Sequence, residues 1–188
     1  MNVIAAIYHR RSVRDYKSDP VPREVIDAVI AAAVHAPSAM NLQPWSFIVI
    51  KGRDILSGYA ERAKRHLVDT MWPDSPLFRY RDRLTDPTFD IFYGAPVLTV
   101  VTATSNTAQS IEDCCMAAQN FMLAAYAMGF GTCCIGFARP WLNLSEAKSE
   151  LRIPQPFVPV IPIIIGYPKS AAPRVSRKLP EIRRVGST

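Results

Sequence analysis

The spacing of apolar residues along the chain changes repeatedly between the period of a helix and that of a strand. From Val25 to Val34, apolar residues recur at three- and four-residue intervals, which is the pattern of one buried helix face. From Val97 to Thr102 the residues are mostly β-branched and apolar, as in a buried strand. The pattern predicts helices at about 3–8, 22–36, 53–66, 110–128 and 143–153. It predicts strands at about 47–50, 97–102, 132–135 and 158–165.

Single residues predict several of the boundaries between these elements. Pro22 suits the first position of a helix, where the missing N–H costs no hydrogen bond. Gly129 suits the position just beyond a helix end, because glycine tolerates a positive φ. Asn143 and Glu146 have the spacing of a capping box. The prolines in the last predicted strand favour a sheet edge or a bulge.

Two segments lie outside this regular pattern. Residues 72–90 are rich in Pro, Asp and Arg, and we expect a loop with one helical turn at most. From Gly166 onward the chain is polar and has no apolar periodicity, so we expect a C-terminal arm at about 168–188. The chain has no repeat and no interior linker. Residues 1–188 are therefore expected to form a single domain with an α+β sandwich fold.

The predicted helix at 110–128 has almost no charge after Asp113. A helix that is apolar all round is buried, so we expect it in the core or at a subunit interface. No apolar stretch reaches the length of a bilayer span, and we expect no membrane association. The N-terminus lacks the basic-then-apolar pattern of an export signal, which favours a cytoplasmic location.

Charge and cysteine content narrow the possible chemistry. The four cysteines form two adjacent pairs, Cys114–Cys115 and Cys133–Cys134, which is not the spacing of zinc ligands or of a redox CxxC motif. We therefore expect no metal site and free, buried thiols. The net charge of +6 suits an anionic ligand. No helix-turn-helix or aromatic RNA-binding pattern accompanies the basic residues, so no nucleic-acid partner is expected.

The run from Arg10 to Arg14, here called the arginine strip, places three cations and a hydroxyl within five positions. In an extended backbone alternate side chains face opposite sides, so Arg10, Ser12 and Arg14 would face one way and Arg11 the other. The strip would span roughly 13 Å, about the reach of a mononucleotide from phosphate to ring. A lone basic run is more often a solvated turn. The functional interpretation therefore depends on the rest of the chain.

Three further segments accompany the arginine strip in a fixed order. Residues 37–45, Pro-Ser-Ala-Met-Asn-Leu-Gln-Pro-Trp, directly precede a predicted strand. Residues 129–136, Gly-Phe-Gly-Thr-Cys-Cys-Ile-Gly, follow the long helix. Residues 163–168, Ile-Ile-Ile-Gly-Tyr-Pro, precede Arg177-Lys178-Leu179-Pro180. In this order and spacing the set resembles the FMN-dependent nitroreductase family from about residue 7 to residue 180.

The resemblance implies a three-layer α-β-α sandwich with a mostly antiparallel central sheet. It also implies a homodimer with FMN sites at the interface and a C-terminal arm that extends onto the partner. The residues implied to bind FMN are Arg10, Arg11, Ser12, Arg14, Pro37, Ser38, Ala39, Asn41, Cys133, Cys134, Ile135, Gly136, Arg177 and Lys178. No side chain is implied as a catalytic acid, base or nucleophile, because the flavin carries the redox chemistry.

The resemblance assigns these residues to different parts of the cofactor. Arg10 and Ser12 would hold the phosphate and ribityl end. Arg14 would lie near the pyrimidine edge, where a permanent cation favours the negative charge of reduced flavin. Arg177 and Lys178 would close over the phosphate.

Two other segments would complete the site. The loop at 37–41 would reach the flavin of the partner subunit, and the backbone at 134–136 would face flavin N5 and O4. Cys134 stands where many family members carry Trp, and Ile135 stands where some carry Glu. These departures concern the shape of the pocket and the preferred acceptor, since backbone contacts do not depend on the side chain.

The function implied is that of an NAD(P)H-dependent FMN oxidoreductase. It would act by a ping-pong mechanism, with NADH or NADPH as reductant and nitroaromatics, quinones or related small molecules as acceptors. One alternative keeps the flavin fold for another reaction, such as reductive dehalogenation, dehydrogenation or flavin cleavage. The other is a basic nucleic-acid-binding or flavin-carrying protein without turnover. A yellow colour would argue against a pure nucleic-acid binder, and bleaching by NADPH would argue against a carrier.

Overall fold

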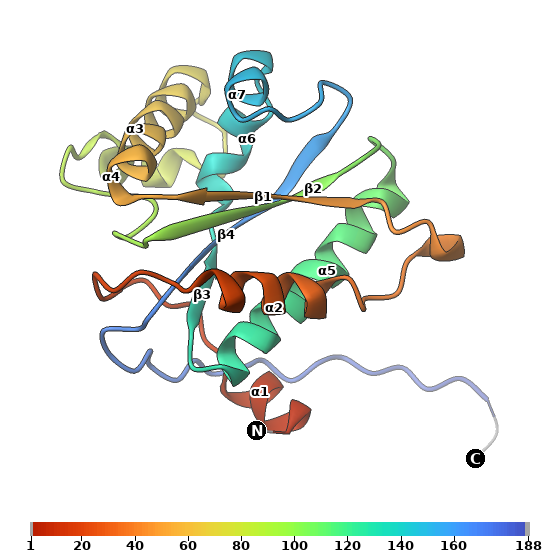
Figure 1. Cartoon of the computed structure of the whole chain (residues 1–188). Coiled ribbons are helices and arrows are strands. Elements are labelled where there is room, and N and C mark those ends of the chain that lie inside the picture. Colours follow the sequence, from red (N-terminus) through yellow and green to blue (C-terminus); the bar gives the residue numbers. More distant parts are fainter. Residues whose placement is uncertain (1, 187–188) are drawn as a thin grey trace.

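The computed structural model describes residues 2–186 and has three layers, with a four-stranded sheet in the middle (Figure 1). One face of the sheet is covered by α2 (Arg23–Ala33) and α5 (Ala108–Ala127). The other face is covered by α3 (Arg53–Thr70) and α6 (Arg139–Leu142). The three-layer α+β sandwich expected from the sequence is confirmed.

The remaining helical elements are short. They are α1 (Val3–His9), η1 (Ala39–Asn41), η2 (Phe78–Tyr80), α4 (Arg81–Thr85), η3 (Gly136–Ala138) and α7 (Ser145–Glu150). The segment at 72–90 is thus less irregular than its composition predicts, because η2 and α4 both lie within it. Within residues 2–186, no helix combines the length and apolar character that crossing a bilayer requires.

The sheet is antiparallel throughout its four strands, in the order β1-β2-β4-β3. Its strands are β1 (Trp45–Lys51), β2 (Val97–Ala103), β3 (Gly131–Cys134) and β4 (Val158–Gly166). All seven residues of β2 are buried, because this strand has neighbours on both sides and helices on both faces. This central burial explains its uninterrupted apolar sequence.

From its prolines, β4 is expected to lie at a sheet edge or to contain a bulge, and the structure shows the bulge but not the edge position. β4 pairs with β2 on one side and β3 on the other, so the edge expectation is wrong. The bulge expectation is confirmed, since Val101 pairs with Ile161 and the next residue pairs with Pro159, which leaves Val160 as the extra residue. The bulge therefore lies between Pro159 and Pro162, both of which keep a paired position opposite β2.

The long helix α5 ends as its sequence predicts. Gly129 has φ +85°, and its N–H donates to the Tyr126 carbonyl at 3.0 Å. The Phe130 N–H donates to the Ala125 carbonyl at 2.9 Å. This pair of bonds is a Schellman motif, which reverses the chain sharply and starts β3 at Gly131.

Three other boundary expectations need correction. Pro22 lies just before α2 and not at its first position. Asn143 and Glu146 form no capping box, because α7 begins after Leu144. The Asn143 amide donates instead to the Arg139 carbonyl at 2.9 Å and to the Pro159 carbonyl at 3.0 Å, which ties α6 to β4. The helix α3 continues to Thr70, beyond the predicted end at residue 66.

The two faces of the sheet carry separate apolar clusters. Successive residues of β4 face opposite sides, so Ile164 packs with Leu98 and Trp141 toward α6. Ile163 packs with Phe121 toward α5. Burying a side chain of this size contributes roughly 1.5–3 kcal/mol. Both layers are therefore needed for stability, and together they fix the sheet edge at β3 where the candidate site lies.

Candidate functional site

The arginine strip leaves the end of α1 and runs along the outer edge of β3. The Arg10 N–H still donates to the Ala6 carbonyl of α1 at 2.9 Å. Ser12 then pairs with Thr132 in a parallel bridge, and the Val13 N–H donates to the Thr132 carbonyl at 3.0 Å. Val13 is buried, which turns the side chains on either side of it outward. The strip is therefore extended backbone docked on the sheet edge.

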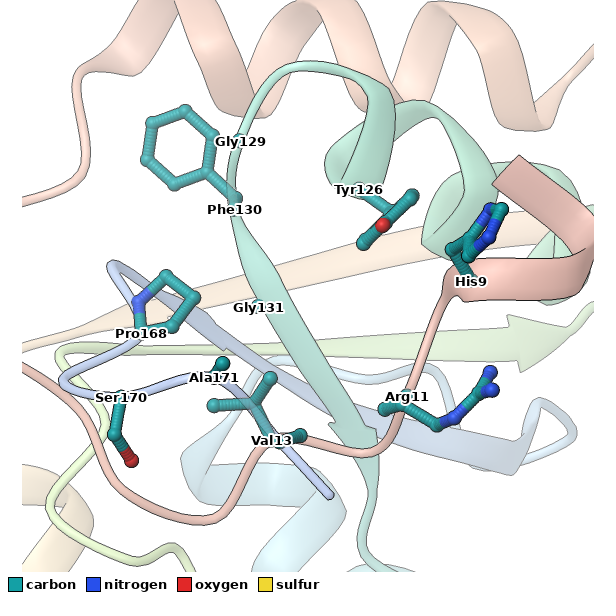
Figure 2. Close-up of a pocket in the computed structure, with 11 residues that line it drawn as sticks. His9, Arg11, Val13, Tyr126, Gly129, Phe130, Gly131, Pro168, Ser170 and Ala171 are labelled. Carbon is teal, nitrogen blue, oxygen red and sulfur yellow. The ribbon is translucent and has the colours of Figure 1, made fainter. Parts of the chain in front are cut away.

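Gly131 allows this close docking. A Cβ at Gly131 would lie 2.7 Å from the Cβ of Val13, closer than carbon atoms approach in folded proteins. The contact is visible in Figure 2, where Val13 lies beside β3 at Gly131. Tyr16 also holds the strip in place, because its buried hydroxyl donates to the Val13 carbonyl at 2.8 Å. Burial raises the pKa of Tyr16 far above its usual value, so the hydroxyl keeps its proton.

The outward side chains of the strip meet the start of the C-terminal arm in a pocket of about 210 Å³, here called the arginine pocket. Its lining is Arg10, Arg11, Ser12, Arg14, Ala172, Pro173, Val175 and Arg177. Four arginine residues thus contribute to the lining of one small volume. The Nε of Arg10 is buried and has no hydrogen-bond partner among residues 2–186. A buried donor without a partner is costly, and an anion in this pocket would satisfy it.

Arg11 differs from its neighbours. Its Nη1 donates to the carbonyl of Tyr8 at 2.8 Å and to that of Arg10 at 2.7 Å, so its side chain caps the C-terminal end of α1. Arg11 also borders a separate pocket on the other side of the strip, which His9 and Tyr126 help to line (Figure 2). Arg11, which we predict to face the opposite side from Arg10, Ser12 and Arg14, therefore makes a structural contact with the end of α1.

A second pocket, here called the β3 pocket, opens at the end of β3 and has a volume of about 330 Å³. Its lining is Arg14, Leu77, Ile91, Tyr93, Cys133, Cys134, Ile135, Gly136 and Phe137. Arg14 borders both the β3 pocket and the arginine pocket. Arg14 is therefore common to a pocket lined by several arginines and to a mostly apolar pocket.

The backbone of the predicted segment 134–136 lies in the β3 pocket, but one of its donors is already used. The Ile135 N–H donates to the Pro162 carbonyl at 2.8 Å. This bond continues the pairing of β3 with β4 by one residue beyond the strand. A ligand in the pocket would therefore have to use other groups of the segment, such as those of Cys134 and Gly136.

The thiols of Cys133 and Cys134 are protonated at neutral pH. The residue Cys134 is exposed as a whole, but its Sγ donates to the Sδ of Met122 at 3.5 Å in a partly buried contact, and desolvation of the thiol raises the pKa of Cys134 to about 11. Burial also raises the pKa of Cys133, and the nearby Arg14 only partly opposes this. The expectation of four buried thiols is wrong for Cys115 and Cys134, which are exposed, although all four are free.

The predicted loop at 37–41 lies away from the strip. It stands at the right of Figure 1, between α2 and β1, whereas the strip lies beside β3 at the lower left. The buried carboxylate of Asp113 accepts the Ala39 N–H, at 3.2 Å from each oxygen, and holds the loop on α5. Met40 and Asn41 have φ of +51° and +56°, so this exposed loop has a defined and strained shape.

The C-terminal arm brings one of its two predicted residues to the site. Arg177 lines the arginine pocket, but Lys178 does not and is exposed. From Pro173 to Gly186 every residue is exposed, and the arm runs past α1 and away from the sheet (Figure 1). Leu179 and Val185 are among the most exposed apolar residues of the chain, at 95% and 101%.

Sequence reasoning missed four residues of the β3 pocket, namely Leu77, Ile91, Tyr93 and Phe137. Leu77 lies in a segment with no apolar periodicity, and Phe137 lies in η3 directly after the predicted segment. Ile91 and Tyr93 precede β2 and become pocket residues only because a turn brings them beside the strip. Gly94 and Pro96, two positions apart, are the available signal, since glycine and proline close together indicate a turn.

A protein-family model described as the nitroreductase family matches residues 7–167. The chain belongs to the nitroreductase family. The match covers the strip, the β3 residues that line the β3 pocket and the whole sheet. The family assignment made from the four sequence segments is therefore confirmed.

Individual members of the family support the same assignment. A Methanothermobacter thermautotrophicus protein provisionally named NADH dehydrogenase/NAD(P)H nitroreductase is 31% identical over 89% of this chain and 78% of its own length. The crystal structure of a Bacteroides fragilis nitroreductase with bound FMN superimposes with a TM-score of 0.85 at 25% identity and covers 99% of this chain and 100% of its own. The rat iodotyrosine deiodinase 1 is 54% identical over 46 residues, which are 24% of this chain and 16% of that protein.

Proposed function

We propose that this nitroreductase-family protein is an FMN-dependent oxidoreductase that passes reducing equivalents from NADH or NADPH to nitroaromatics, quinones or related acceptors. The observation that carries the proposal is the position of Arg14, which borders both the arginine pocket and the β3 pocket. FMN matches this pair of pockets, because it has a phosphate dianion at one end and a flat, largely apolar ring at the other.

The arginine pocket supplies what the phosphate end needs. Arg10 has a buried Nε without a partner, and Arg177 approaches the same volume from the arm. Guanidinium groups bind phosphate through paired, charge-assisted hydrogen bonds. Ser12, exposed on the same side, adds a neutral donor toward a ribityl chain. Arg11 would contribute mainly by holding the end of α1, because its Nη1 is already bonded to two carbonyls.

The β3 pocket supplies what the ring end needs. Its walls are mostly apolar, and Arg14 lies at the border with the arginine pocket. Bound FMN would take up two electrons from NAD(P)H and deliver them to an acceptor that replaces the oxidised nicotinamide. Arg14 cannot lose its proton, so it stabilises negative charge at that end of the pocket. Cys133 and Cys134 stay protonated because burial raises the pKa of both thiols, and neither acts as a nucleophile.

The site is proposed to be completed by a second copy of the chain. The loop at 37–41 lies apart from the strip within one chain, so it would serve the pocket of the partner. The helix α1 exposes Val3, Ile4 and Tyr8, at 64%, 58% and 70%. Together with the exposed arm, this apolar surface is suited to an isologous dimer interface. The free thiols suit a reducing compartment such as the cytoplasm.

A second candidate reaction has one specific observation in its favour. The 46-residue match to iodotyrosine deiodinase 1 has a far higher identity than the full-length match to the nitroreductase relative. Reductive dehalogenation of an aromatic substrate would use the same two pockets. The two reactions are separated by comparing turnover of nitroaromatics with halide release from a halophenol under the same reductant.

The decisive experiment begins with the spectrum of the purified protein. The proposal predicts oxidised-flavin bands near about 370 and 450 nm, and anaerobic NADH or NADPH should bleach them. Addition of a nitroaromatic or quinone should then restore the colour. A colourless protein that does not take up added FMN would reject the proposal, and bound FMN that no nicotinamide reduces would leave only a carrier.

A further inference from the structure

The turn before β2 holds a bulky residue in an unfavourable conformation. Tyr93 has φ +55° and is followed by Gly94 with φ +65°, so two consecutive residues are left-handed. Glycine adopts this conformation at little cost, whereas a tyrosine there is an outlier. The chain has glycine at the second of these positions and tyrosine at the first. The fold therefore holds Tyr93 in a conformation that a tyrosine backbone disfavours.

The surrounding hydrogen bonds fix this turn firmly. The Asp90 carboxylate accepts the Phe92 N–H at 2.8 Å and the Gly94 N–H at 2.7 Å. The Tyr93 N–H donates to the Asp90 carbonyl at 3.1 Å. Ile91 and Phe92 are completely buried and anchor the turn in the core. The strained conformation is thus imposed by several independent contacts and does not relax.

The same neighbourhood aims the Tyr93 ring at the β3 pocket. The Phe89 ring packs edge-on against it, with 5.8 Å between centroids. Lys64 holds the backbone of Phe89, because its buried Nζ donates to the Phe89 carbonyl at 2.8 Å. The guanidinium carbon of Arg14 lies over the Tyr93 ring, 6.0 Å from its centroid. The ring therefore packs against Phe89 and also lies beside the Arg14 guanidinium.

Apart from Tyr93 and the nearby Cys133 thiol, Arg14 has few contacts that would hold its guanidinium in place. It is exposed, and among residues 2–186 it forms no ion pair with a carboxylate. A long side chain without a partner samples several rotamers, which weakens its field at any one point. An aromatic face within about 6 Å attracts a guanidinium without neutralising its charge, unlike a carboxylate.

We propose that Tyr93 is a positioning residue, whose strained turn holds its ring against Arg14 so that the guanidinium stays at the border of the two pockets. This inference rests on the proposed FMN function and deepens it. The aromatic face is the acting group and the hydroxyl is not. Tyr93 thereby raises the midpoint potential of the bound flavin through Arg14, and it also forms one wall of the pocket that receives the acceptor.

The test compares Tyr93→Leu, Tyr93→Phe and Tyr93→Gly in the flavin-loaded protein. Tyr93→Leu should make the flavin potential more negative and slow reduction by NADPH about tenfold, with less than a threefold change in FMN affinity. Tyr93→Phe should keep a flavin potential and a reduction rate close to those of the wild type, because it retains the aromatic face. In the Arg14→Ala background, Tyr93→Leu should have little further effect on the potential, because the group it positions is absent.

A second measurement separates this role from a purely structural one. Tyr93→Gly loses the packing of the ring but relieves the positive φ, so its FMN-free form should lose less thermal stability than Tyr93→Leu, yet the potential should fall as in Tyr93→Leu. Tyr59→Leu is the matched control, since Tyr59 also packs on an arginine, Arg62 at 4.9 Å, but lies outside both pockets. It should lower the melting temperature and leave the potential unchanged.

The possible failures are distinct. If the wild-type protein neither binds FMN nor is reduced by NADPH, the proposed function falls, and the role of Tyr93 falls with it. If the wild type behaves as proposed but Tyr93→Leu has a normal potential, only the role of Tyr93 is overturned. A Tyr93→Phe variant as impaired as Tyr93→Leu also overturns it, because the hydroxyl would then be the acting group.

Discussion

Val13 and Gly131 touch where the arginine strip docks on β3, and no side chain larger than hydrogen fits at residue 131. An added methyl group would lie 2.7 Å from the Val13 Cβ and 2.9 Å from one of its methyl groups. This contact sets the distance between the strip and the sheet edge. The arrangement of both pockets therefore depends on a glycine that binds no ligand itself.

Gly131→Ala is predicted to push the strip off β3. We expect a loss of roughly 1–3 kcal/mol in the free energy of unfolding, as for other overpacked sites, and a loss of at least about tenfold in FMN affinity. Gly58→Ala in α3 is the matched control, because nothing lies within 4 Å of the added methyl. It should stabilise the protein by about 0.5–1 kcal/mol. Urea unfolding and FMN titration of both variants provide the check, and unchanged FMN affinity in Gly131→Ala would contradict the account.

Stability is predicted to fall steeply at alkaline pH. Burial raises the pKa of Cys114 from 9.0 to about 12 and that of Cys134 to about 11. Between pH 9 and 11 the unfolded chain loses these protons while the folded protein keeps them. The unfolded state then binds fewer protons, so the free energy of unfolding decreases as pH rises. Cys114→Ala should flatten this decline in melting temperature measured from pH 8 to 11, and an equally steep decline in that variant would contradict the assignment.

Cys134 is predicted to react slowly with alkylating reagents and to be protected by FMN. Its raised pKa, about 11, leaves a minute thiolate fraction at pH 7. Labelling by iodoacetamide should therefore rise about tenfold per pH unit from pH 7 to pH 10. Because Cys134 lines the β3 pocket, bound FMN should slow its labelling, while labelling of Cys115 on α5 should not change. Peptide mass spectrometry distinguishes the two sites, and equal labelling of Cys134 with and without FMN would remove it from the cofactor site.

The extent to which the sequence predicts this structure depends on how local each feature is. Alternation along the strip and the helix end at Gly129 were predicted correctly, because both follow from the conformations of a few consecutive residues. Asn143 was misassigned because its amide bonds a carbonyl of β4, at Pro159, which is a tertiary contact. Tyr93 was missed for the same reason, since its neighbour Arg14 is distant in the sequence.

The position of β4 in the sheet illustrates a second limit. Its prolines predicted the bulge, which is a local feature. They did not predict that β3 would pair on its outer side, because strand order is a property of the whole chain. The roles of the loop at 37–41 and of Lys178 depend on a second copy and stay predictions.

FMN binding is predicted to require residues of two subunits. An Arg10→Ala subunit lacks its own phosphate contact, and an Asn41→Ala subunit lacks the loop residue proposed to serve its partner. A mixed dimer would have one site with both defects and one site with neither. Refolding the two variants together should therefore recover tight FMN sites that neither parent has, as measured by fluorescence titration. A mixture that binds no better than its parents would show that the loop does not act across the interface through Asn41.

One FMN is proposed to span the arginine pocket and the β3 pocket, with Arg14 at the border. The most direct test measures both the dissociation constant and the midpoint potential of bound FMN in Arg10→Ala and Arg14→Ala. Arg10→Ala should weaken binding by about 30- to 150-fold, equivalent to roughly 2–3 kcal/mol, and leave the potential near that of the wild type. Arg14→Ala should make the potential more negative, with a smaller loss of affinity. If Arg10→Ala and Arg14→Ala changed the dissociation constant and the midpoint potential in the same way, or if neither variant changed them, FMN would not span the two pockets as proposed.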